Sequence, residues 1–177
     1  MKGNNLLLRA PEPADIDLIY RWENDLRIWH LGNTLTPYSR FAIEQFVLNT
    51  DNDIYAAKQL RLMIDCYSSP KGNITIGSID LFDFDPHHQR AGIGILIDEP
   101  YRNQGFATEA LNLLTGYCFD ILNLHQLYCN IEQSNEESFR LFAKAGFLPC
   151  GTKKEWLKQE GKWLDELMFQ LINTVNS

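Results

Sequence analysis

A short stretch of the chain combines the residue types that bind a phosphate group. It lies between an apolar run, Ala91 to Asp98, and a helical pattern, Glu109 to Leu122, and consists of Arg102, Asn103, Gln104, Gly105, Phe106, Ala107 and Thr108. The first N–H groups of a helix have no intrahelical partner and lie at the positive end of its dipole, so they favour an anion. Gly105 lets the backbone approach a ligand closely, and Arg102 adds a positive charge. The stretch therefore indicates a diphosphate site, although an ordinary strand-helix connection shows the same pattern.

The composition limits the classes of partner and cofactor. The 177 residues include 16 Lys and Arg against 23 Asp and Glu, which gives a formal net charge of −7. This charge disfavours nucleic acids and anionic membranes and is compatible with a cationic substrate, although it also serves solubility. No metal-ligand spacing is present, and we expect buried thiols at Cys66, Cys118, Cys129 and Cys150. Because Met1 to Arg9 contains no long apolar run, we expect a cytoplasmic protein.

Hydrophobic periodicity and turn residues predict the elements that hold this corner. Helices are expected over Ala14 to Asn24, Asp25 to Leu31, Arg40 to Asn49, Glu109 to Leu122 and Asn135 to Ala145. Strands are expected over Leu6 to Arg9, Leu60 to Tyr67, Ile74 to Phe84, Gln89 to Asp98, Gln126 to Gln133, Phe147 to Trp156 and Lys162 to Asn173. Ser134 and Glu137 have the spacing of a capping box. The simplest arrangement is one α+β domain, residues 1–177, with a mostly antiparallel sheet.

Two segments, in the right order, resemble the GCN5-related N-acetyltransferases (GNAT). The first is the strand Ile93 to Asp98 with its corner Arg102-x-x-Gly105-x-Ala107. The second matches the family pattern Asn-x-x-Ala/Ser-x-x-x-Tyr-x-x-x-Gly-Phe, except at the tyrosine, with Asn135, Ser138, Phe142, Gly146 and Phe147. Further matches to the spermidine/diamine branch and to the branch that acetylates ribosomal-protein N-termini are Leu8, Arg9, Gly161 and Asp165.

The resemblance implies a strongly twisted mixed sheet flanked by helices, in which two central strands splay apart to admit acetyl-CoA. Here the splay would separate Ala91 to Asp98 from Leu127 to Gln133. The glycines at 92 and 94 agree with this, because a strand glycine marks a bulge or a close approach. The implied pantetheine-binding residues are Leu96, Ile97 and Asn135, the last of which could instead only cap a helix.

The implied reaction is direct attack of a primary amine on the acetyl thioester, without a covalent enzyme intermediate. An alkylammonium has a pKa of about 10 and must lose a proton first, whereas the departing thiolate, with a pKa of about 8.5, needs a proton less urgently. The usual general acid is a tyrosine, and Phe142 takes its place in the acetyl-CoA site. The proton could then come from Tyr128, Tyr101 or water, or CoA could leave as a thiolate.

The general base is equally open from the sequence. Glu132 is our candidate because it shares a strand face with Tyr128 beside the expected splay. The alternatives are Asp80, Asp83, His87 and His88. Each of these side chains could instead serve only packing or solvation, and the same holds for the tyrosines.

The acceptor site is expected in the segment after the first helix, where relatives build that side of the cleft. Aromatic rings beside carboxylates suit an alkylammonium, and this segment holds Trp22, Glu23, Asp25, Trp29 and His30. The tryptophans could equally pack the first helices on the sheet. We expect acetyl transfer to a polyamine or diamine. The alternatives are acetylation of a protein N-terminus and an inactive CoA-binding module, which Phe142 keeps open. No metal, nucleic acid or membrane is expected, and a homo-oligomer stays open.

Overall fold

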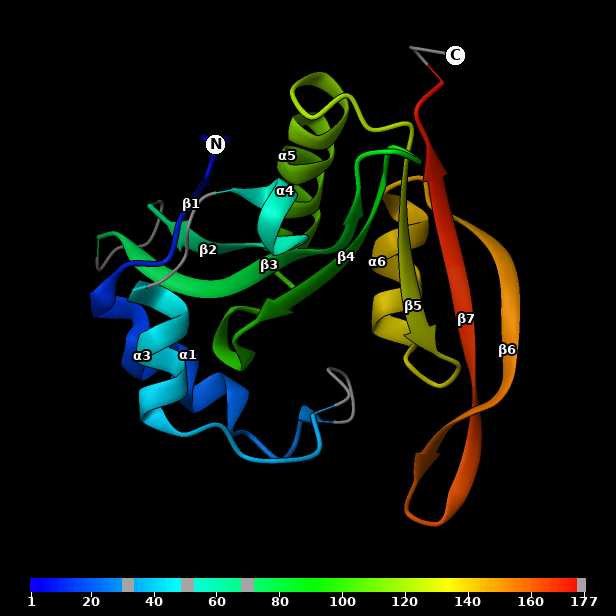
Figure 1. Cartoon of the computed structure of the whole chain (residues 1–177), viewed down its shortest axis with the longest axis horizontal. Helices are drawn as coiled ribbons and strands as arrows, with labels where there is room; N and C mark the ends of the chain where they lie inside the picture. The colour runs from blue at the N-terminus through cyan, green and yellow to red at the C-terminus, as the bar shows by residue number, and fades with distance from the viewer. Residues whose placement is uncertain (30–33, 49–52, 68–71, 175–177) are drawn as a thin grey trace.

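A seven-stranded mixed sheet organises the chain, for which a computed structural model describes residues 1–29, 34–48, 53–67 and 72–174. In sheet order the strands are β1 (Leu6–Arg9), β2 (Leu60–Cys66), β3 (Ile74–Asp85), β4 (Arg90–Ile97), β5 (Gln126–Glu132), β7 (Lys162–Ile172) and β6 (Leu148–Gln159) (Figure 1). Among the strands of the described residues, only the central pair, β4 and β5, is parallel. The expected α+β class and mostly antiparallel sheet are confirmed.

Helices cover both faces of this sheet. The main ones are α1 (Ile16–Glu23), α3 (Arg40–Leu48), α5 (Phe106–Asp120) and α6 (Glu136–Lys144), with short turns at η1 (Pro13–Asp15), α4 (Ile54–Ala57) and η2 (Glu99–Tyr101). In β2, Leu62 and Ile64 pack in the core cluster with α5 and α6, whereas Met63 between them packs with α1 and α3. Because successive side chains of a strand point to opposite faces, α1 and α3 lie on the face opposite α5 and α6.

Several element boundaries differ from the prediction. Helix α5 begins at Phe106 rather than Glu109, so the end of the corner is already helical, and α4 was not anticipated. Of the expected helix Asp25 to Leu31, residues 26–28 form a turn and Trp29 is helical, while residues 30 and 31 lie outside the described residues. Cys150 is exposed because it lies on the edge strand β6, while the other three cysteines are buried. Among the described helices, none has the length and apolar character needed to cross a membrane.

Gly92 makes room for an aromatic ring at the centre of the sheet. A Cβ at Gly92 would overlap the ring of Phe82 in β3, whereas a Cβ at Gly94 would find its nearest atom at 3.9 Å. The Phe82 ring packs edge-on against Tyr128 of β5, with ring centroids 5.8 Å apart. The sequence predicted that a ligand or another part of the chain comes close to the backbone at Gly92, and the ring of Phe82 does so. The pairing register of β3 with β4 shifts between Phe82 and Asp85, and Asp83 of β3 has φ 50°.

Gly92→Ala should destabilise the fold by about 1–3 kcal/mol, because the added methyl group forces Phe82 to move against Tyr128. Gly94→Ala is the matched control and should be neutral or slightly stabilising, since alanine restricts the unfolded chain more than glycine. Urea unfolding of both variants checks this. Equal midpoints for the two variants would contradict the packing role of Gly92.

Candidate active site

The two central strands separate soon after they begin to pair. β4 and β5 are joined only over three residue pairs, from Arg90 with Gln126 to Gly92 with Tyr128. Beyond these pairs β5 follows β7 and β4 follows β3, and the two strands diverge (Figure 1). Within the described residues, the backbone of residues 93–97 therefore has no strand partner on its β5 side. Because buried N–H and C=O groups need partners, this edge can accept an extended ligand that carries amides.

The end of β4 is tied to the corner by Arg102. Its Nε donates a hydrogen bond to the carbonyl oxygen of Ile97 over 3.0 Å. Gln104 Nε2 donates to the Pro100 carbonyl over 3.1 Å, which closes the turn on itself. The Ile97 carbonyl is therefore already occupied. Asp98 N donates to the Ile76 carbonyl, so the hydrogen-bonded pairs alternate along β3 and β4, and the backbone groups of Leu96 face Ser78 of β3. The backbone groups that face the diverging side belong to Ile93, Ile95 and Ile97.

The corner presents unpaired donors at the start of α5. Gly105 is the N-cap residue, with φ 86°, a conformation that glycine adopts without strain. The first helical backbone bond runs from Glu109 N to Gly105 O, and a glycine cap offers no side-chain acceptor. Among the described groups, the N–H groups of residues 106–108 thus have no capping partner. Since no atom lies within 4 Å of a Cβ position at Gly105, an anion has open access.

Asn135 serves as the N-cap of α6. Its Oδ1 accepts a hydrogen bond from Ser138 N over 3.1 Å, so the capping box expected at Ser134 is wrong. Ser134 instead turns back towards Glu132. Phe142 of α6 is buried in the core cluster and packs edge-on against Phe147, with centroids 5.1 Å apart. The ring fills space and offers no proton.

Tyr128 lies at the last paired position before the strands diverge. Its hydroxyl donates to Asp83 Oδ2 over 3.0 Å. Burial, together with the neighbouring Asp83 carboxylate, raises the pKa of Tyr128 to about 12. The hydroxyl is thus protonated at neutral pH, but its proton is already engaged, which makes it a poor acid for a departing thiolate.

Glu132 lies further along the same face of β5 as Tyr128, where alternate residues share a side. One carboxylate oxygen accepts from Ser134 N over 2.8 Å and the other from Ser134 Oγ over 2.7 Å. The neighbouring position on β7 is Glu166, which forms an ion pair with Lys153 over 2.7 Å. A base at Glu132 is therefore held in one orientation by Ser134.

The residues expected to bind the acceptor lie together on the α1 face, but two of them already have cationic partners. Glu23 forms an ion pair with Arg61, which also binds Asp80 of β3 over 2.7 Å. Burial raises the pKa of Asp80 despite the guanidinium beside it. Asp25 pairs with Arg27 over 2.7 Å, and these hydrogen bonds lower the pKa of Asp25 to about 2.

The two tryptophans of this cluster differ in their surroundings. Trp22 is buried among the residues of α1, α3 and β2, as the packing alternative predicts. Trp29 Nε1 donates to the Glu23 carbonyl over 2.8 Å, and His30 lies outside the described residues. The arginine partners of Glu23 and Asp25 were not among the site residues expected from the sequence. The one signal for Arg61 was its place opposite Asp80 in a predicted hairpin.

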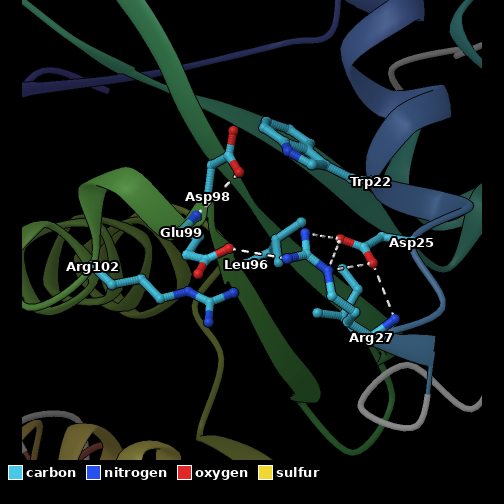
Figure 2. Close-up of a pocket in the computed structure, with 8 residues that line it drawn as sticks. Trp22, Asp25, Arg27, Leu96, Asp98, Glu99 and Arg102 are labelled. Atoms are coloured by element: carbon cyan, nitrogen blue, oxygen red, sulfur yellow. Dashed lines mark hydrogen bonds and ion pairs between the residues drawn. The ribbon is translucent and has the colours of Figure 1, made fainter.

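A pocket of about 210 Å³ lies between the α1 segment and the end of β4. Figure 2 shows Trp22 above Leu96 and Arg27, with Asp98, Glu99 and Arg102 on the other side. Ion pairs cross it: Arg27 reaches Glu99 over 3.1 Å. The pocket thus joins the expected acceptor segment to the expected diphosphate corner. No group of three or more metal-ligating side chains occurs in the described part of the chain.

Comparisons with known proteins agree with this architecture. The family model described as an acetyltransferase (GNAT) domain matches residues 5–148. Over 148 residues the chain is 28% identical to the spermidine N(1)-acetyltransferase of Escherichia coli (strain K12), which covers 82% of this chain and 74% of that protein. The crystal structure of spermidine N-acetyltransferase from Vibrio cholerae in complex with CoA and spermine superposes with a TM-score of 0.83 at 24% identity, covering 96% of both chains. A dodecameric structure of the Vibrio cholerae enzyme has a TM-score of 0.76 at 23% identity, over 96% of this chain and 95% of that one.

The family match covers most of the chain, and the fold agrees with it. The diverging central strands and the glycine-capped helix lie within the matched residues. The chain therefore belongs to the GNAT acetyltransferase family and is an N-acetyltransferase that uses acetyl-CoA.

Proposed function

We propose that acetyl-CoA binds along residues 93–97 and places its diphosphate at the Gly105 corner. The pantetheine arm carries two amides, which suit the free edge of β4 at Ile95 and Ile97. The N–H groups of Phe106, Ala107 and Thr108 suit the diphosphate, and Arg102 adds charge, while Asn103 and Gln104 shape the turn. Asn135 and Phe142 complete the site on α6 in this proposal, Asn135 having a capping role as well.

The residues of this chain supply little acid catalysis in the proposed reaction. The amine nitrogen attacks the thioester carbonyl, the carbon–sulfur bond breaks, and CoA leaves as a thiolate. Glu132 accepts the proton that the attacking amine releases, held in place by Ser134. Asp80 is the alternative base, because its raised pKa favours proton uptake. Tyr128 has a supporting role through its bond to Asp83.

The acceptor that we propose is a polyamine or diamine. The observation that carries this proposal is that two carboxylates, Glu23 and Asp80, share one guanidinium on the α1 face, which leaves one negative charge unbalanced. Asp80 lies opposite Gly94 of β4. Because glycine has no side chain, this position leaves space on the sheet surface next to Asp80. An alkylammonium would balance the charge. The spermidine acetyltransferases among the relatives support the same class of acceptor.

A protein N-terminus is the second candidate acceptor, since it is also a primary amine. A peptide would present side chains and carbonyl groups to the site as well as the amine. The dodecameric relative supports a homo-oligomer for this chain. Turnover of spermidine, putrescine and short peptides under one condition tests the choice, and faster turnover of peptides than of every polyamine would favour the second candidate.

Gly105→Asn should raise the KM for acetyl-CoA at least about tenfold, because its side chain would enter the space before the free N–H groups. Asparagine tolerates a positive φ better than most residues, so the variant should fold. Gly72→Asn is the matched control, with φ 87° and open space around it, and should leave the KM unchanged. Unchanged acetyl-CoA affinity in a folded Gly105→Asn variant would refute the diphosphate site.

Tyr128→Phe should lower kcat less than about tenfold, since the hydroxyl proton is engaged with Asp83 and thiolate departure needs no acid. Glu132→Gln is the comparison on the same strand face. It should lower kcat by about a hundredfold, the scale of a lost general base. A loss beyond about a hundredfold in a stable Tyr128→Phe variant would instead identify Tyr128 as the acid.

Glu23→Gln should raise the KM for spermidine about threefold to tenfold and weaken its dependence on salt, because a screened attraction is lost. Asp25→Asn should have little effect on this KM, because Arg27 already balances the charge of Asp25. Glu23→Gln should leave the KM for acetyl-CoA unchanged, since Glu23 does not line the pocket at the corner. Asp17→Asn removes another paired carboxylate of α1, exposed and bound to Arg40, and serves as the control. Polyamine kinetics that do not respond to Glu23→Gln would exclude Glu23 from the acceptor site.

A further inference from the structure

The pocket between α1 and β4 contains a buried hydrogen-bond donor that has no partner in the described structure. Trp22 is 6% exposed, and its Nε1 is the one buried side-chain nitrogen or oxygen without a partner among the described residues. In Figure 2 the nitrogen lies on the ring edge that faces Leu96 and Arg27 across the pocket. A buried donor left unpaired costs about 1–3 kcal/mol, so a ligand atom that accepts its hydrogen bond would be favoured there.

The acceptor groups of the pocket walls are already engaged elsewhere. Asp25 accepts hydrogen bonds from Arg27, including its backbone N–H. Asp98 accepts from Arg21 Nη2 over 2.6 Å and from the Glu99 backbone over 3.1 Å. Glu99 in turn accepts from Arg27. The carboxylates that line the pocket are thus committed to guanidinium groups, and the indole N–H remains for a bound molecule.

The charges of the pocket select a neutral ligand group. Three carboxylates line it, at Asp25, Asp98 and Glu99. Three guanidinium groups balance them, because Arg27 and Arg102 line the pocket and Arg21 binds Asp98. An ammonium gains no net attraction there and, as a donor only, cannot accept from an indole N–H. An amide carbonyl or a hydroxyl oxygen meets both conditions.

We propose that Trp22 donates a hydrogen bond to an amide or hydroxyl oxygen of the pantetheine arm of acetyl-CoA, so that α1 contributes to the donor site. The arm is neutral and carries oxygens of both kinds. Leu96 lines the pocket, and its neighbours Ile95 and Ile97 present the free edge of β4, so an arm along that edge passes beside the indole. This inference rests on the donor site proposed above and is independent of the acceptor. Trp22 is a positioning residue in this role.

The test is the affinity of the full chain for CoA, measured by calorimetry without any amine. Trp22→Phe keeps an aromatic ring in the core and deletes the N–H. We expect CoA to bind about fivefold to tenfold more weakly, the effect of one neutral hydrogen bond. Adenosine 3′,5′-bisphosphate, which lacks the pantetheine arm, should bind unchanged. Trp163→Phe on the exposed part of β7 is the matched control and should affect neither ligand.

A change in CoA affinity of less than twofold, or an equal loss for both ligands, would overturn the proposal. A raised KM for the amine with unchanged CoA affinity would assign the pocket to the acceptor instead and would also overturn it. Because no amine is present in the binding assay, failure of polyamine turnover leaves this result intact.

If Trp22→Phe does not fold, the wild-type protein provides the measurement. The chain has four tryptophans, so its indole N–H signals in an NMR spectrum can be assigned through Trp→Phe variants at the other three positions. The Trp22 signal should shift downfield on addition of CoA and stay in place with adenosine 3′,5′-bisphosphate. A Trp22 indole signal whose chemical shift does not change when CoA is added would contradict the proposed hydrogen bond.

Discussion

The separation of β4 from β5 is the constraint on which the rest of the site depends. Backbone groups inside a sheet cannot stay unpaired without cost, and here, among the described residues, the edge of residues 93–97 has no neighbouring strand on the β5 side. β5 is held away because it pairs with β7 along its whole length. At the last shared position the rings of Phe82 and Tyr128 pack together over Gly92. The free edge is therefore fixed by packing on both sides and is ready for an extended ligand.

Ion pairs connect the two halves of the proposed site across sequence-distant segments. Arg21 binds Asp98 and Arg27 binds Glu99, so the α1 segment is fastened to the turn that leads into α5. Exposed pairs of this kind contribute only about 0–1 kcal/mol each, so they orient the segments more than they stabilise the fold. Arg61 differs because it is half-buried and serves two carboxylates. Removing Arg61 would leave like charges facing each other, which makes it the less replaceable arginine.

Local patterns predicted much of the fold and part of the site. The alternation in β2 and the glycine at the start of α5 are local signals, and both led to the right elements. The choice between Ser134 and Asn135 as helix cap depends on backbone angles one residue apart, which spacing rules do not resolve. The pairing of Glu23 with Arg61 and the unpaired nitrogen of Trp22 arise from tertiary contacts, so no local pattern could reveal them. Asp25 and Arg27 are two residues apart, and their pairing depends on the turn at residues 26–28, where the sequence predicted a helix.

The phenylalanine at position 142 is easier to understand once the proton requirements are compared. The ring is buried and packs edge-on against Phe147, so the position contributes to the core of the sheet and α6. An alkylammonium, with a pKa of about 10, must be deprotonated before it attacks, whereas a thiolate with a pKa of about 8.5 is a tolerable leaving group near neutral pH. Losing the acid therefore costs less than losing the base would. In the reaction proposed above, a packing residue can therefore stand in place of the tyrosine, provided that a carboxylate takes up the proton of the amine.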